Sequence, residues 1–309
     1  MNVNSRSLNL SLLMLCLFMG IAASSNSTSE TVSKISAINA SGSKVNELQN
    51  VTVTLPRPTG RKKPNQYIEQ LITAAFATQG KAVRYEYNEL PSNQFRLNKL
   101  LAEGETVDLA WLPADKSRTE SFDYIPVPLY QGLHGMRLMF IKDGTQQRFD
   151  NVRSLSELSQ LIALQERSWS DYSILKDNGL KVNGELDYDA MLKALSQGIG
   201  DYFPRSALTI FAEFRRAKKQ SIVVEQGLLL EYPMYVVLFL STKQPLLMHD
   251  LRDGFDIIVS DGTFKVIFDK FYQSRLANLH LADRHRIALV NKEIPVKVVR
   301  LLKQHIILD

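Results

Sequence analysis

The chain has 309 residues and a formal net charge of +5, from 37 Lys and Arg against 32 Asp and Glu. This charge is small and dispersed, so it does not favour nucleic acid as a partner. Cys16 is the single cysteine and lies in the N-terminal apolar segment, so a chain without that segment can form neither disulfides nor Cys-ligated zinc sites. The five histidines lack the spacing of a metal site, and we expect no cofactor and no metal.

The N-terminus has the pattern of a secretory signal. Arg6 precedes an apolar run over residues 8–23 that is short for a membrane span and ends in small residues. We predict a cleaved signal peptide over residues 1–23 and hence a periplasmic protein; an uncleaved anchor is the alternative. Residues 24–50 are rich in Ser, Asn, Thr and Lys, which predicts a flexible tether.

Strands and helices alternate in the next part of the chain. Val51–Leu55 alternates Val and Thr as a strand does, and residues 66–79 place apolar side chains on one helical face. A strand over 82–87, a helix over 94–102 and a strand over 107–112 follow. This alternation predicts a parallel sheet with helices on its faces.

The second half of the chain continues in the same way. Residues 135–142 form a long apolar strand, and Ser154 with Glu157 forms a capping box that opens a helix. The apolar run 232–241 is too short to span a bilayer and predicts a buried strand. We also predict strands over 161–164, 201–203 and 221–224, and helices over 172–178, 187–197, 208–214, 246–260 and 263–272.

Residues 107–135 carry the clearest family pattern. The predicted strand ends in a polar loop with one arginine, Arg118, and a Phe-Asp-Tyr…Pro-Leu-Tyr segment follows over 122–130. This stretch resembles the periplasmic solute-binding proteins of the type 2 class, family-3 group, and the similarity extends over about residues 51–275. The resemblance implies that Arg118 clamps the carboxylate of a ligand, a role that suits a guanidinium because it can bind a carboxylate through two parallel hydrogen bonds.

The resemblance also implies the fold. We expect two α/β lobes, each an open, mostly parallel sheet flanked by helices, joined by two crossing strands that act as a hinge. Lobe 1 is predicted over residues 51–141 plus 233–309, and lobe 2 over 142–232. The ligand would lie between the lobes, and hinge closure would exclude water from it.

A second arginine is predicted near a strand end in lobe 2. The segment 201–206 places Arg205 where ligands bind in open α/β sheets. Many amino-acid-binding relatives carry an aspartate near this point, which this chain lacks. One arginine in each lobe predicts an anionic solute; the alternative is that Arg205 bonds backbone carbonyls at a helix start.

The turn 167–171 precedes a predicted helix. Free N–H groups at a helix N-terminus bind anions, and the resemblance implies that Ser168 and Ser170 add hydroxyl groups. N-capping by Ser170 is the alternative. We expect Trp111 and Tyr130 to form apolar walls of the site and Trp169 to cover it, with packing inside the lobes as the alternative.

These patterns together predict a monomeric binding protein without catalytic activity. It would capture a small anionic solute and pass it to an ABC-type membrane transporter or report it to a membrane sensor. The alternative is an exported enzyme on the same scaffold, similar to cyclohexadienyl dehydratases. Such an enzyme needs a carboxylic acid as general acid, and Glu166 is the nearest candidate.

Overall fold

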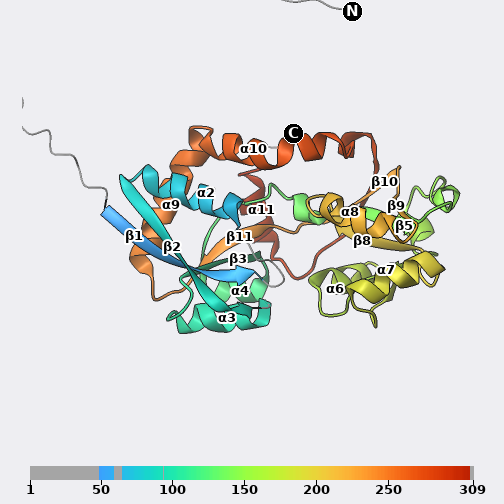
Figure 1. The fold of residues 1–309 in the computed structure, drawn as a ribbon, viewed down its shortest axis with the longest axis horizontal. Coiled ribbons are helices and arrows are strands. Elements are labelled where there is room, and N and C mark those ends of the chain that lie inside the picture. The colour runs from blue at the N-terminus through green and yellow to red at the C-terminus, as the bar shows by residue number, and fades with distance from the viewer. Residues whose placement is uncertain (1–48, 59–64, 93, 307–309) are drawn as a thin grey trace, which may run out of the picture. The chain divides into compact units, whose positions relative to one another are not determined.

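A computed structural model describes residues 49–58, 65–92 and 94–306 (Figure 1). The predicted signal peptide and residues 24–48 of the predicted tether lie outside these ranges. Gln49 and Asn50, which we placed in the tether, instead begin the first strand. In the part of the chain that the structure describes, no helix combines the length and apolar character that crossing a membrane requires.

The first group of elements surrounds helix α2 (Gln66–Ala77). It connects β1 (Gln49–Pro58) to β2 (Lys81–Ser92), and the two strands pair in parallel. Beside them β11 (Val236–Leu240) is the middle strand of a three-stranded antiparallel sheet with β3 (Leu109–Pro113) and β4 (Asp123–Ile125). The helices of this group are α3 (Gln94–Glu103), α4 (Lys116–Ser121), α9 (Pro245–Ser260) and α10 (Thr263–Ala277).

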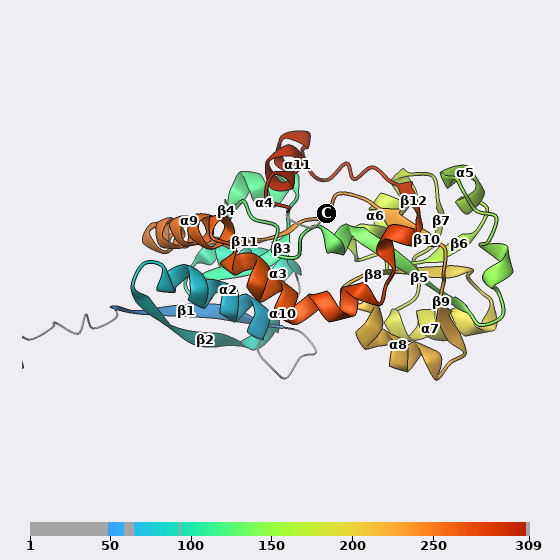
Figure 2. The ribbon, with the colours of Figure 1, turned by 90° about the horizontal axis from the view of Figure 1, so that it is seen from above.

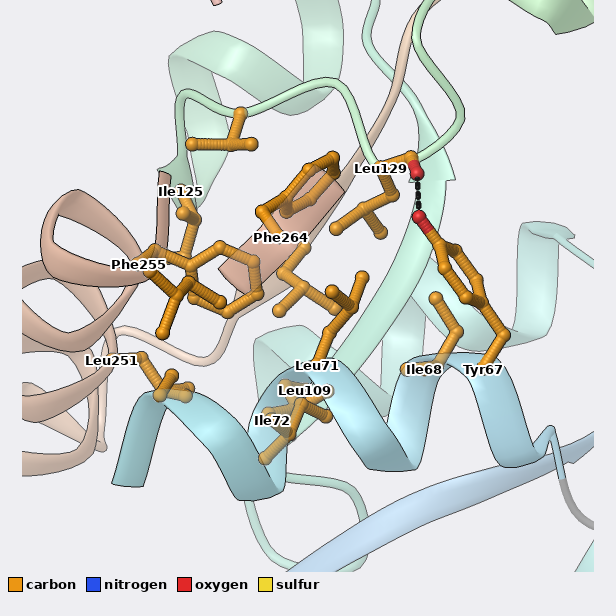
Figure 3. Close-up of a cluster of buried hydrophobic side chains, with 14 of the residues drawn as sticks. Tyr67, Ile68, Leu71, Ile72, Leu109, Ile125, Leu129, Leu251, Phe255 and Phe264 are labelled. Atoms are coloured by element: carbon orange, nitrogen blue, oxygen red, sulfur yellow. Dashed lines mark hydrogen bonds between the residues drawn. The ribbon is translucent and has the colours of Figure 1, made fainter. Parts of the chain in front are cut away.

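The two small sheets of this group are joined beside β1. The backbone N–H of Asp108 donates to the carbonyl oxygen of Thr54 at 3.0 Å, and the Asp108 carboxylate accepts from the Thr54 N–H at 2.7 Å. Buried side chains of α2, α9 and α10 fill the space over the strands, and Figure 3 shows Leu71, Phe255 and Phe264 among them. The Tyr67 hydroxyl, buried in the same cluster, donates to the carbonyl oxygen of Leu129.

The second group of elements is built on a seven-stranded mixed sheet around β5 (Met136–Lys142) (Figure 2). Alternate residues of β5 enter two cores, with Met139 and Ile141 on one face and Leu138 and Phe140 on the other. Its other strands are β6 (Ile162–Leu164), β7 (Lys181–Asn183), β8 (Tyr202–Ser206), β9 (Ile222–Val224), β10 (Leu228–Glu231) and β12 (His285–Ala288).

Helices cover both faces of this sheet. Those on the Met139 face are α5 (Leu155–Leu158) and α6 (Ser170–Asp177), and those on the Leu138 face are α7 (Tyr188–Gln197) and α8 (Ile210–Lys218). The predicted caps form: Ser154 accepts from the Glu157 N–H, and Asp187 accepts from the Ala190 N–H. The sheet has more antiparallel pairs than we expected, because β5 runs against β8, β9 and β10.

The C-terminal segment contributes to both groups. Leu279 is buried in a core of the seven-stranded sheet, β12 pairs with β10, and α11 (Val296–Lys303) then packs Val298 and Leu302 against β3 and β11. We expected the whole tail to pack on lobe 1, which holds for α11 and not for β12. Strand β12, and β5 apart from Lys142, lie within ranges predicted for lobe 1 but are hydrogen-bonded into the seven-stranded sheet. From here on, the first group of elements is called lobe 1 and the second group lobe 2.

Candidate functional site

Arg118 lies in α4, directly after β3, with its side chain buried. Asp115 is the N-cap of α4; it accepts from the Arg118 N–H and pairs with the Arg118 guanidinium at 2.5 Å. The guanidinium also donates to the carbonyl oxygen of Pro113 at 2.9 Å and to the side chains of Asn98 and Gln94 at 3.0 and 3.1 Å.

These contacts determine how many N–H donors of Arg118 remain for a ligand. A guanidinium has five N–H donors, and internal acceptors take four of those of Arg118. Burial lowers the pKa of Arg118 from its ordinary value, and the neighbouring Asp115 carboxylate opposes that shift. Arg118 therefore braces α4 against α3 through its contacts with Asn98 and Gln94.

Arg205 lies on β8, near the strand end where we expected it. Its guanidinium makes two hydrogen bonds to the Glu213 carboxylate, at 2.6 and 2.7 Å, so it does not bond backbone carbonyls in the way the alternative required. The guanidinium carbon lies 4.9 Å from the ring centre of Trp169, 4.8 Å from that of Phe203 and 5.4 Å from that of Tyr188. Trp169 and Arg205, both predicted site residues, are therefore brought together.

A third arginine, Arg137, is the second residue of β5 and is 5 % exposed. Its guanidinium pairs with the Asp171 carboxylate at 2.5 Å, and the Tyr232 hydroxyl donates to the same carboxylate. Burial has the largest single effect and lowers the pKa of Arg137, but Asp171, Tyr232 and Glu213 together outweigh burial and raise the pKa above its ordinary value. This network joins α6 to β5 at Arg137 and to the segment between β10 and β11 at Tyr232.

Gln165 follows β6 and is fully buried. Among the described residues, neither its side-chain oxygen nor its side-chain nitrogen has a hydrogen-bond partner, and the same is true of the Arg137 Nε. Ala163 and Leu164 enter opposite cores, so strand alternation directs Gln165 to the face that Arg137 also occupies. Unpaired buried polar atoms are costly, so this set of atoms calls for a binding partner.

The two predicted serines lie on the surface of lobe 2. Ser168 is exposed, and its hydroxyl donates to the Glu166 carboxylate at 2.6 Å. Glu166, the candidate general acid of the enzyme alternative, therefore contacts a side chain on the surface. Ser170 is exposed and is the first residue of α6; the N-cap is Trp169, so Ser170 does not cap the helix. Trp169 is half-buried and stacks on Phe203.

The predicted aromatic residues of lobe 1 differ in burial. Tyr130 is buried and its ring packs against those of Tyr67, His134 and Tyr272, which is the core packing we gave as the alternative. Trp111 is half-buried on β3 and lies at the edge of the same core. The structure does not bring these two residues together with Trp169 and Arg205 in one cluster.

The charges of the three arginines are balanced within their own lobes. Arg118 is paired with Asp115, Arg137 with Asp171, and Arg205 with Glu213. A guanidinium that already binds a carboxylate offers little net charge to a second anion. The geometry therefore does not support the anionic solute that we predicted from one arginine in each lobe.

Sequence reasoning missed the acids of these pairs. Glu213 lies eight residues after Arg205 and Asp171 lies on a different element from Arg137, so no local spacing connects either pair. For Arg137 the sequence does indicate a paired acid, because this charge interrupts an apolar strand, but it does not identify Asp171. In the described part of the chain, no group of three His, Cys, Asp or Glu residues could hold a metal ion.

Comparison with known proteins identifies the class of fold. No family model matches the sequence, and a search of curated proteins gave no match. Two solved structures of an ancestral arginine-binding protein, bound to arginine and to glutamine, are 16% and 15% identical, with TM-scores of 0.50 and 0.51. Each alignment covers 72% of this chain and 98% or 97% of the other.

A third structure agrees. A probable amino-acid ABC transporter extracellular-binding protein from Bacillus subtilis is 15% identical, with a TM-score of 0.53, over 72% of this chain and 98% of its own. At these identities the likeness establishes the fold. The chain has the two-lobed fold of the type 2 periplasmic binding proteins, which confirms the fold class predicted from the sequence.

Proposed function

We propose that the protein is an exported solute-binding protein that captures a small molecule between its two lobes. The observation that carries this proposal is the fold itself: two α/β units, each with its own core, linked by short segments before β5 and before β11. Such linkers allow hinge closure around a ligand. The predicted signal peptide supports export, and an ABC-type transporter or a membrane sensor would receive the solute.

The proposed contact surface of lobe 2 is the edge of the sheet at Trp169, Arg205 and the start of α6. Trp169 is half-buried and is held in place by Phe203 and Arg205, and we propose that a ligand stacks on its ring. Ser168 and Ser170 add exposed hydroxyl groups beside it. Because the arginines are internally paired, we propose a solute without net negative charge, such as a neutral, zwitterionic or cationic compound.

A thermal-shift screen tests this proposal. The purified protein is heated with amino acids, their amides, amines and dicarboxylates at equal ionic strength. A bound ligand at one hundred times its Kd stabilises a protein by about 2.7 kcal/mol, which is readily detected. We expect at least one compound other than a dicarboxylate to raise the Tm.

The hit is then titrated against two variants of lobe 2. Trp169→Ala should weaken binding about tenfold because the stacking surface is lost. The matched control is Phe211→Ala, on the exposed face of α8, which should bind as the parent does. A screen without any hit contradicts the binding function, and equal affinities of Trp169→Ala and Phe211→Ala contradict the proposed contact surface.

A further inference from the structure

The N-terminus of α6 carries an acid of its own. Helix N-termini attract anions because their first N–H groups lack intrahelical acceptors and the helix dipole is positive there. In α6, no side chain caps this end, and the first turn contains Asp171. Asp171 is 7 % exposed, so its carboxylate is a buried negative charge of the chain itself at the anion-binding end of the helix.

The groups that bind Asp171 are those that would bind any carboxylate. The guanidinium of Arg137 and the hydroxyl of Tyr232 both donate to it, from β5 and from the end of β10. The Nε of Arg137 is buried and has no partner among the described residues, and the same holds for the side-chain amide of Gln165 on the same face of the sheet. The position is thus a formed carboxylate site whose guanidinium retains one unpaired N–H donor.

We propose that Asp171 is a specificity-determining residue: it fills the carboxylate site at the start of α6 and thereby excludes carboxylate groups of solutes from lobe 2. This inference rests on the proposed solute-binding function. It gives a reason why the solute would carry no net negative charge. A second carboxylate at this position would lose its hydration without gaining a counter-charge, because Asp171 already occupies the Arg137 guanidinium and the Tyr232 hydroxyl. The solute group that faces α6 is then uncharged or cationic.

The test uses acetate as the probe, since acetate matches the side chain that Asp171→Ala removes. Thermal unfolding of the parent and of Asp171→Ala is followed in sodium acetate and in sodium chloride of equal ionic strength. The parent should respond equally to both salts. Asp171→Ala should melt lower in chloride, because Arg137 is left buried and unpaired, and its Tm should rise with acetate by about 5 °C at a hundredfold excess over Kd.

A double variant separates a specific site from a general salt effect. In Arg137→Met with Asp171→Ala the cation that attracts acetate is gone, so the acetate response should disappear and part of the lost Tm should return. If Asp171→Ala does not fold in chloride, the yield of refolding from urea is compared in the two salts, and recovery in acetate alone supports the proposal.

Three results would overturn the inference. They are an acetate response of Asp171→Ala no larger than that of the parent, an undiminished response of the double variant, or refolding of Asp171→Ala in neither salt. No solute is used in these experiments. Their failure therefore leaves the solute-binding proposal intact, and an unsuccessful solute screen does not affect their outcome.

Discussion

Within lobe 2, the Arg205 guanidinium is paired with a carboxylate, and its flat faces are covered by aromatic rings. Two parallel hydrogen bonds reach Glu213, and aromatic rings contact the guanidinium from several sides. Lysine keeps the charge but has neither the planar group that stacks nor the paired donors that match a carboxylate. Arg205→Lys should therefore lower the free energy of unfolding by about 1.5 kcal/mol, as measured by urea denaturation.

The control for this variant is another arginine of the same lobe. Arg167 pairs with Glu185, but both side chains are mostly exposed, at 62% and 71%. Exposed pairs contribute little to stability, so Arg167→Lys should change the free energy of unfolding by no more than about 0.5 kcal/mol. If the two lysine variants were equally stable, the aromatic and carboxylate contacts of Arg205 would not stabilise the lobe.

The location of a single residue was predictable where its place at the end of a strand determined its neighbours. Trp169 and Arg205 were placed at strand ends in lobe 2 and do lie together there. Arg118 was assigned to a ligand from a pattern of neighbours in sequence, whereas its acceptors Gln94 and Asn98 come from α3. The partners of a long charged side chain depend on tertiary packing, which one sequence does not reveal.

The packing of α9 on α2 depends on one glycine. A Cβ atom at Gly254 would lie 2.3 Å from the carbonyl oxygen of Ala75, and this oxygen belongs to the backbone of α2. The helices would have to separate, so Gly254→Ala should cost about 2 kcal/mol despite the better helix propensity of alanine. Urea denaturation measures this cost.

A variant elsewhere on α9 serves as the control. His249 is 74% exposed on the same helix, and His249→Ala should leave the stability within about 0.5 kcal/mol. Unchanged stability of Gly254→Ala would mean that α9 can move away from α2 without losing its core contacts.

The sequence predicted the bounds of an element closely where apolar residues recur at helical spacing over a long stretch. Helices α2, α7 and α9 were each expected within about two residues of their observed ends. Strands β4, β7, β10 and β12 were missed as separate elements because three or four residues carry too little pattern, and pairing with neighbouring strands defines them. Helix α4 has no apolar period, although Asp115 before it was an available N-cap signal.

At the scale of the whole molecule, the C-terminal segment contributes side chains to the cores of both lobes. Ile287 is 4 % exposed in the core of lobe 2, and Leu302 is fully buried in that of lobe 1. Ile287→Ala should lower the free energy of unfolding by about 3 kcal/mol, because the truncation leaves a cavity in the core. Urea denaturation measures the loss.

The same segment offers a matched control. Val290, three residues later, is 62% exposed, and Val290→Ala should remain within about 0.5 kcal/mol of the parent. Equal stability of the Ile287 and Val290 variants would mean that β12 adds little to lobe 2.

The dual attachment of this segment limits how far apart the lobes can move. Besides the links before β5 and before β11, the chain passes from lobe 1 to lobe 2 after α10 and returns between Leu289 and Ile294. Those last five Cα–Cα steps reach at most about 18 Å when fully extended. The separation between Leu289 and Ile294 cannot exceed this reach while β12 stays paired, so the two lobes can open only by pivoting about this connection.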